Sequence, residues 1–425
     1  MKRNRFNLSK KIMAIIFVTT IMGGVFLGFS KSEIIAADYT VSNSIWDGTV
    51  ASSFADGSGT IDDPYMVSTA AELAYLAESV NNGVSYGGKY IALKNDIYLN
   101  DVSNFDDWSN VVIPNNIWSG INGFCGTIDG CGSTIYGMYV CNSQNNSGFI
   151  NSTKNISNSS INLTGKAIIK NINFKNSYVY GTAYVGTIIG NAKYAEIDNC
   201  KVEGKVIATK TDTNVGGFVG YFSSGGNRGL SIINSTNNSF VSGNTNVGGF
   251  VGFASVGNSS GYSTSGNGSE KIVVKNCVNY GTVEARGDYV GGIVGKIDRS
   301  MNCGGLELKC LGNQGNISGA QYVGGLFGRL TGDYYEICLD ESYNSGNITG
   351  TSYIGGLIGM ADSGTLASRA VMQNLYNVGN VGSEITTSCV VSESPWGNRE
   401  KLCFAINSKR WNKKMVILGL IQDSG

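Results

Sequence analysis

The chain has 425 residues, of which 15% are charged, and its 31 basic and 31 acidic residues give a formal net charge of zero. A nucleic-acid partner is therefore not expected, because neutralising phosphates requires a concentrated basic face. Histidine is absent, which excludes Ser-His-Asp and Cys-His nucleophile systems, H-E-x-x-H zinc sites and histidine-ligated metals. We predict no catalytic residue, no cofactor-binding residue and no metal site.

Residues 1–37 have the organisation of a secretory signal peptide. Five Lys and Arg residues precede an uncharged run of 18 residues from Ile12 to Phe29, and small residues at Ala36 and Ala37 come before Asp38. An uncleaved anchor is the alternative, since about 18 residues is the lower limit for spanning a bilayer. We expect cleavage, no membrane span in the mature chain, and a secreted protein that is extracellular or associated with the cell surface.

Residues 38–145 are expected to form an N-terminal cap and the first coils of a solenoid. Thr69 and Glu72 have the spacing of a capping box and Gly83 is suited to a helix C-terminus. Four apolar residues fall on one face of the helix so defined: Leu73, Leu76, Ala77 and Val80. An amphipathic helix here would cover the first strand edges of the solenoid. Residues 89–100 alternate as a strand, and residues 126–140 read as two strands separated by glycine turns.

Residues 146–386 contain a repeat. Nearly the same heptad occurs six times, as YVGTIIG, NVGGFVG twice, YVGGIVG, YVGGLFG and YIGGLIG, beginning at Tyr184, Asn214, Asn246, Tyr289, Tyr322 and Tyr353. The starts are 30, 32, 43, 33 and 31 residues apart, a period typical of a solenoid. One unit is predicted to contain three short strands, with the heptad as one of them, which fits an all-β, right-handed parallel β-helix. The Gly-Gly pair indicates a bend or a close backbone approach, and residues such as Val290, Ile293 and Val294 are predicted to form buried columns.

The chain has ten cysteines, which in an exported protein normally suggests disulfides. Cys200 and Cys277 each stand four residues before a glycine, where other units have Ser235, Ser342 or Leu375. A position that accepts Cys, Ser and Leu indicates an inward stack of buried thiols rather than bridges. Cys125 and Cys131, six residues apart, are the pair best placed for a disulfide.

Three features could serve a ligand. Trp46, Trp108 and Trp118 are candidate sugar-stacking platforms, although packing within the cap explains them better. Polar insertions at 222–229, 253–270 and 297–304 are loops on the solenoid surface, either ligand-binding or simply solvated. Adjacent acids could supply catalysis, but their turn contexts favour solvated residues or helix N-caps: Asp62 and Asp63, Asp106 and Asp107, and Asp340 and Glu341.

Residues 387–425 break the pattern, because a seventh heptad is due near residue 385 and does not occur. We interpret this atypical tail as out of register with the repeat, as in a frameshifted or truncated gene product; a specialised tail is the alternative.

The last five residues of the heptads, GGFVG, GGIVG, GGLFG and GGLIG, resemble the GLUG motif of large bacterial surface proteins, which include adhesins and the non-catalytic repeat region of some immunoglobulin A1 metallopeptidases. Residues 57–83, followed by 88–99, are similar to the segment that commonly begins such β-helices. The resemblance implies a secreted or surface-exposed bacterial protein and no particular activity, since the zinc motif of the peptidases needs histidine. We expect a non-enzymatic scaffold or adhesion module for glycans or host and extracellular proteins. A polysaccharide lyase or glycoside hydrolase built on a parallel β-helix is the alternative.

Overall fold

The computed structural model describes residues 44–382 except 142, 144, 155–164, 212, 226–227, 258–270, 300–304, 333–336 and 362–369. These residues belong to one compact unit. The predicted signal peptide at 1–37 and the tail at 387–425 lie outside the described residues. Of the three predicted insertions, residues 226–227, 258–270 and 300–304 also lie outside them. The residues before these gaps, 222–225, 253–257 and 297–299, lie in β-strands, so the prediction that they belong to loops is wrong.

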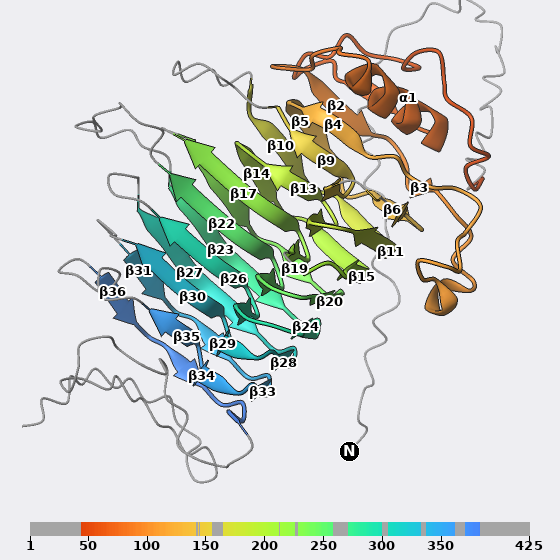
Figure 1. Ribbon diagram of the computed structural model, residues 1–425. Coiled ribbons are helices and arrows are strands. Elements are labelled where there is room, and N and C mark those ends of the chain that lie inside the picture. The colour runs from red at the N-terminus through yellow and green to blue at the C-terminus, as the bar shows by residue number, and fades with distance from the viewer. Residues whose placement is uncertain are drawn as a thin grey trace, which may run out of the picture. The chain divides into compact units, whose positions relative to one another are not determined.

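The described chain forms a parallel β-helix, which confirms the predicted fold class (Figure 1). Its strands stack on their counterparts in adjacent coils and form three parallel sheets, which we call sheets 1, 2 and 3. The 22 strands of sheet 1 are β1 (Tyr65–Val67), β2 (Tyr90–Leu93), β3 (Ile97–Tyr98), β5 (Gly126–Asp129), β6 (Thr134–Tyr136), β7 (Tyr139–Cys141), β10 (Ala167–Lys170), β11 (Asn173–Gly181), β14 (Ala195–Asp198), β15 (Lys201–Ala208), β18 (Leu230–Ile233), β19 (Thr236–Asn237), β20 (Phe240–Gly243), β23 (Ile272–Asn279), β24 (Val283–Ala285), β27 (Leu306–Asn313), β28 (Ile317–Ser318), β31 (Ile337–Asp340), β32 (Tyr343–Asn344), β33 (Ile348–Thr349), β36 (Ala370–Gln373) and β37 (Tyr376–Asn377).

Sheets 2 and 3 are built from the heptads and their equivalents in the first coils. The seven strands of sheet 2 are β8 (Asn146–Ser147), β12 (Tyr184–Gly186), β16 (Asn214–Gly216), β21 (Val247–Gly248), β25 (Val290–Gly291), β29 (Gln321–Gly324) and β34 (Ser352–Gly355). The eight strands of sheet 3 are β4 (Ile121–Phe124), β9 (Ile150–Thr153), β13 (Ile189–Ala192), β17 (Val219–Gly225), β22 (Val251–Gly257), β26 (Val294–Arg299), β30 (Phe327–Gly332) and β35 (Ile358–Ala361).

Each heptad is a corner between two strands, so the prediction that it forms a single strand is wrong. In the heptad that begins at Tyr289, β25 ends at Gly291, the chain bends at Gly292 and Ile293, and β26 begins at Val294. A Cβ atom on Gly292 would lie 2.3 Å from the carbonyl oxygen of Gly325 in the next coil. Only glycine fits, which confirms the predicted bend and close backbone approach.

The core consists of apolar columns that run from coil to coil. Val215, Val247, Val290 and Val323 are in register along sheet 2, and all four are fully buried. Ile293 and Val294 are also buried, as predicted. Neighbouring coils are separated by one strand spacing of about 4.8 Å, so each side chain packs directly on its counterparts in the coils on either side.

The N-terminal cap contains the single α-helix of the described residues, α1 (Ala70–Asn81), and a 3₁₀ helix, η1 (Phe105–Asp107). Thr69 and Glu72 form the predicted capping box, and the four predicted apolar residues are buried. At the end of α1, Asn81 accepts a hydrogen bond from the backbone N–H of Asn122 and donates one to the carbonyl of Gly120. The helix thereby lies against β4, the edge strand of sheet 3, and protects it. None of the helices in the described part of the chain is long and apolar enough to cross a membrane.

Candidate functional surface

A buried column of asparagines runs through five coils beside the heptad corners. Its members are Asn237, Asn279, Asn313, Asn344 and Asn377, all of which are almost inaccessible to solvent. Each of the first four donates a hydrogen bond from Nδ2 to Oδ1 of the next, over 2.6–2.7 Å. Each of the last four also donates to the backbone carbonyl of the glycine two residues later, over 2.8–2.9 Å. The amides are thus paired inside the core, which removes the penalty of burying them.

The second glycine of the heptad is explained by this asparagine column. A Cβ atom on Gly292 or Gly325 would lie 2.4–2.5 Å from Cγ of the asparagine in the next coil, Asn313 or Asn344. The one heptad that has no glycine here has Thr187, and its next coil has Val202, which pairs in register with Asn237. The repeated Gly-Gly therefore makes room for the amide column as well as for the bend.

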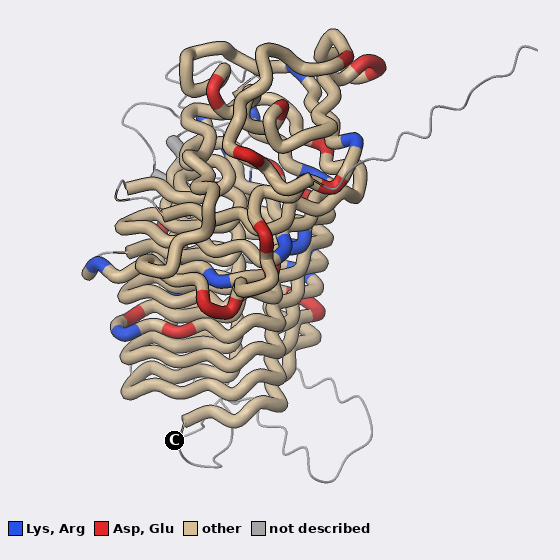
Figure 2. Tube along the Cα trace, turned by 90° about the vertical axis from the view of Figure 1, so that its right-hand side faces the viewer, with Lys and Arg blue, Asp and Glu red and all other residues tan. Residues whose placement is uncertain are grey.

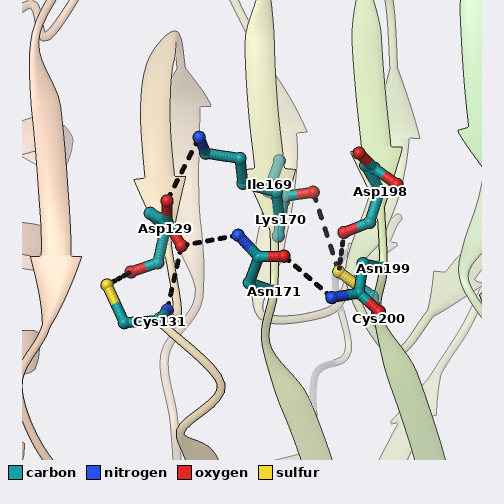
Figure 3. A network of polar contacts seen from close by, with 8 residues as sticks. All are labelled: Asp129, Cys131, Ile169, Lys170, Asn171, Asp198, Asn199 and Cys200. Carbon is teal, nitrogen blue, oxygen red and sulfur yellow. Dashed lines mark hydrogen bonds and ion pairs between the residues drawn. The ribbon is translucent and has the colours of Figure 1, made fainter. Parts of the chain in front are cut away.

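A second asparagine column lies on the outer turn of sheet 1, where each coil has one residue with a positive φ. Asn171 and Asn199 have φ values of 52° and 51°, a conformation that asparagine tolerates better than most residues. In Figure 3, Asn199 donates to Asn171 over 2.8 Å and Asn171 donates to Asp129 over 3.0 Å. Burial alone would raise the pKa of Asp129, but the hydrogen bonds from Asn171 and Cys131 and the pairing with Lys170 outweigh it and hold the pKa below its ordinary value.

The predicted inward cysteine stack is present. Cys200 and Cys277 are fully buried free thiols, and Ser235 and Ser342 occupy the corresponding places in other coils. The Cys200 thiol lies 3.3 Å from the carbonyl oxygen of Asp198 (Figure 3). Burial raises the pKa of both thiols to about 12, so they are inert as nucleophiles near neutral pH.

The predicted disulfide between Cys125 and Cys131 is wrong. Cys125 is buried, Cys131 is exposed, and both are free thiols. The strand β5 lies between them, and its four extended residues separate the two positions by about 13 Å, whereas disulfide-bonded Cα atoms lie within about 7 Å of each other.

The candidate tryptophans pack the cap, as the preferred interpretation predicted. Trp108 and Trp118 are each 2% exposed, and Trp46 packs partly buried against the core. Trp118 stacks on Phe149 with ring centroids 5.5 Å apart, and its indole N–H donates to the Phe149 carbonyl over 3.0 Å. The buried rings of Trp108 and Trp118 are therefore not accessible to a sugar, and Trp46, which is half-buried, contacts Trp118 at an interplanar angle of 63°.

The prediction that the adjacent acids are turn residues or helix N-caps is confirmed for Asp62 and Asp63 only, because Asp106 and Asp107 lie within a 3₁₀ helix and Asp340 is the last residue of β31. Asp62 and Asp63 are exposed residues of a turn, and Asp106 and Asp107 belong to η1. Asp340 accepts hydrogen bonds from Gln373 and Asn374, which hold its pKa below the ordinary value. Over the described ranges, no group of three or more Cys, Asp or Glu side chains is arranged to hold a metal ion.

The outer side of the heptad corner carries a different surface, which we call the heptad seam. It consists of the first residue of each heptad and the residue that follows the heptad's last glycine. The first column is Tyr184, Asn214, Asn246, Tyr289, Tyr322 and Tyr353; the second is Asn191, Tyr221, Phe253, Lys296, Arg329 and Met360. All but Asn214 are partly exposed. The sequence did not predict the seam. The first residue of the heptad and the residue after its last glycine come together only when the heptad folds as a corner.

Aromatic and cationic side chains contact one another across the seam. The rings of Tyr289, Tyr322 and Tyr353 stack in succession, with centroids 5.0 and 4.7 Å apart. The Lys296 ammonium lies 5.3 Å from the Tyr289 ring centroid, and the Arg329 guanidinium lies 5.2 Å from that of Tyr322. Both are cation–π contacts.

The three stacked tyrosines have positive φ values of 66°, 57° and 53°. This conformation costs a residue other than glycine or asparagine about 1 kcal/mol or more. Asn246 occupies the same place one coil earlier with a φ of 50°, so the corner itself does not require tyrosine. Unlike Asn246, the three tyrosines gain ring-stacking contacts with one another at this position.

The seam columns contain two cations and no acid. Lys193 lies beside them, 5.9 Å from the Tyr221 ring centroid, and Asp298 lies beside Lys296 at 3.5 Å. On the side of the molecule in Figure 2, acidic and basic residues are scattered among uncharged ones. The seam thus combines aromatic rings with local positive charge on a chain whose net charge is zero.

No known protein family and no curated protein matches the sequence. Among solved structures, the chain is similar to a "putative immunoglobulin A1 protease" from Bacteroides ovatus, with 19% sequence identity, a TM-score of 0.44, and coverage of 70% of this chain and 80% of that one.

Proposed function

We propose that this chain is a secreted or cell-surface bacterial repeat protein of the GLUG type. In this proposal it is a non-enzymatic scaffold or adhesion module that presents its solenoid surface to glycans or to host and extracellular proteins.

The observation that carries the proposal is that some repeated side chains are buried and join neighbouring coils, whereas those of the heptad seam are partly exposed. Contacts between neighbouring coils are made by the buried asparagines, the buried thiols and the paired residues of the turns. The heptad seam leaves aromatic and cationic groups partly exposed in successive coils, in contact with one another. A regular surface of this kind suits an extended ligand or a broad protein contact better than a single small molecule.

The test uses the mature chain on glycan and extracellular-matrix arrays, together with assays for reducing ends and unsaturated uronates on a panel of polysaccharides. We expect retention on an array and intact polysaccharides. Catalytic release of sugar would support a lyase or glycosidase and overturn the proposal, as would the absence of binding on every array.

A further inference from the structure

We propose that the heptad seam binds an acidic polysaccharide that lies along the solenoid axis. This inference rests on the proposed function and specifies its ligand.

The first argument is the charge of the seam. Lys296 and Arg329 are paired in register on adjacent coils, and the two seam columns hold no carboxylate. The Lys296 side chain is 19% exposed, so its ammonium is partly shielded from water by the rings of Phe253 and Tyr289. A partly desolvated cation forms stronger charge-assisted hydrogen bonds to carboxylate or sulfate than a fully hydrated one. Two carboxylates lie beside the seam columns: Asp298 forms an ion pair with Lys296 at 3.5 Å, and Asp288 accepts a hydrogen bond from the backbone N–H of Gln321. They offset part of the positive charge of Lys296 and Arg329.

The second argument is spacing. Successive rings of the tyrosine stack are 5.0 and 4.7 Å apart, a distance comparable to the advance of one sugar residue in an extended polysaccharide. Each coil can thus present one tyrosine edge to one sugar. Tyrosine at a sugar site contributes an apolar ring edge and a hydroxyl that hydrogen-bonds to sugar hydroxyls.

The third argument is the extent of the surface. The aromatic positions begin at Tyr184 and Tyr221, whose rings stack at 4.7 Å, and continue through Phe253 to Tyr353. The seam therefore runs along six coils without a change of direction, as the stacked strands of sheets 2 and 3 show in Figure 1. A linear polymer matches this shape, and several weak contacts along it add up through multivalency.

The experiment measures binding of the mature chain to hyaluronan and polygalacturonate, which carry carboxylates, to heparin and chondroitin sulfate, which also carry sulfates, and to neutral galactan. We expect binding to at least one acidic polymer, weakened by salt, and much weaker binding to galactan. Lys296→Gln and Arg329→Gln should each lower affinity about tenfold or more, while Lys296→Arg keeps it. Comparison of the affinities for the carboxylate polymers with those for the sulfated polymers identifies which anion is preferred.

Lys309→Gln is the matched control. Lys309 is a lysine of β27 in sheet 1, paired with Glu307 at 3.6 Å, and its loss removes the same charge away from the seam. Tyr353→Leu should weaken binding without changing its salt dependence. Circular dichroism melts establish that each variant is folded.

Equal affinity of wild type and a folded Lys296→Gln variant would overturn the inference, and so would equal binding to galactan. If the chain binds only neutral glycans or matrix proteins, the seam inference fails and the proposed scaffold function stands. If it binds nothing, or degrades the polymers, both fail.

Discussion

Replacing Asn313 by alanine tests whether the buried asparagine column holds the coils together. Asn313 accepts a hydrogen bond from Asn279 over 2.7 Å and donates to Gly315 and Asn344 over 2.8 and 2.6 Å. Alanine removes one hydrogen bond from each of three buried groups, the Asn279 amide, the Gly315 carbonyl and the Asn344 Oδ1 atom, and each loss costs about 1 kcal/mol. The free energy of unfolding should therefore fall by about 3 kcal/mol, and by more if the lost amide leaves a cavity.

The assay is urea unfolding followed by far-ultraviolet circular dichroism, with native-state hydrogen exchange to locate the effect. Tryptophan fluorescence is unsuited to it, because Trp46, Trp108 and Trp118 lie near the N-terminal end and the other two tryptophans, Trp396 and Trp411, lie outside the described residues. Repeat proteins are stabilised by nearest-neighbour contacts, so exchange should accelerate in the coils around Asn313 and remain slow in α1.

The control is Gln314→Ala in the same turn. Gln314 is exposed and donates one hydrogen bond, to the Tyr343 hydroxyl over 2.8 Å, so its loss should cost less than about 0.5 kcal/mol. An Asn313→Ala variant within that margin of wild type would refute the reasoning, because the column would then contribute nothing. If hydrogen exchange in α1 accelerated as much as in the coils around Asn313, the destabilisation would not be local and the reasoning would fail.

Three further predictions follow from the core. Gly325→Ala should destabilise the fold by more than about 2 kcal/mol, because its Cβ would lie 2.2 Å from the Gly356 carbonyl oxygen; urea unfolding measures this. Trp118→Ala should cost about 3–5 kcal/mol and lower the melting temperature, because it removes a buried ring from the cap. Cys200 and Cys277 should resist a thiol reagent in the folded chain and react with it after denaturation. Above pH 9 the two thiols ionise in the unfolded chain but not in the folded one, so the free energy of unfolding should fall.

The sign of the pH effect follows from the raised pKa. Burial favours the neutral thiol of Cys200 in the folded chain, so its contribution to stability is complete below the ordinary pKa of 9.0 and is lost as the pH rises towards about 12. Tyr178, whose pKa burial also raises to about 12, titrates in the same window. Comparison of wild type with Cys200→Ala isolates the thiol: the alkaline slope should be shallower in the variant, and identical slopes would contradict the assignment.

Gly287→Ala is the control for the heptad glycine. Gly287 has no positive φ in the disfavoured range, and a Cβ there would lie 2.9 Å from the Asn244 carbonyl oxygen, against 2.2 Å at Gly325. The Gly287→Ala variant should therefore lose less stability than the Gly325→Ala variant. Similar losses at the two positions would show that the corner has no special requirement for glycine.

The fold was predictable from the sequence because its signals are local. Thr69 and Glu72 define the helix start by their spacing, and the burial of Val290, Ile293 and Val294 follows from apolar repetition alone. The buried role of Cys200 was also accessible, since serine and leucine replace it in other coils. Each of these inferences needs only a pattern along the chain.

The rest depends on contacts between coils. The heptad looks like a strand because it is apolar. Its Gly-Gly pair predicts a bend, but the assignment of the two halves of the heptad to different sheets depends on strand pairing between coils. Asn279 and Asn313 look like solvated turn residues, although their buried pairing has a signal in the recurrent Asn-x-Gly at 279–281, 313–315, 344–346 and 377–379. The disulfide prediction considered the number of residues between Cys125 and Cys131 but not the extended strand that separates them.

The two kinds of column differ in how much they vary along the chain. The buried asparagine column keeps one residue type through five coils, because an amide pairs correctly only with another amide in the same place. The second column of the seam changes in every coil, from Asn191 through Tyr221 and Phe253 to Lys296 and Arg329. A position that tolerates such variety is not fixed by the stacking of coils. Differences between coils at this column therefore alter the chemistry of the surface while the scaffold stays the same.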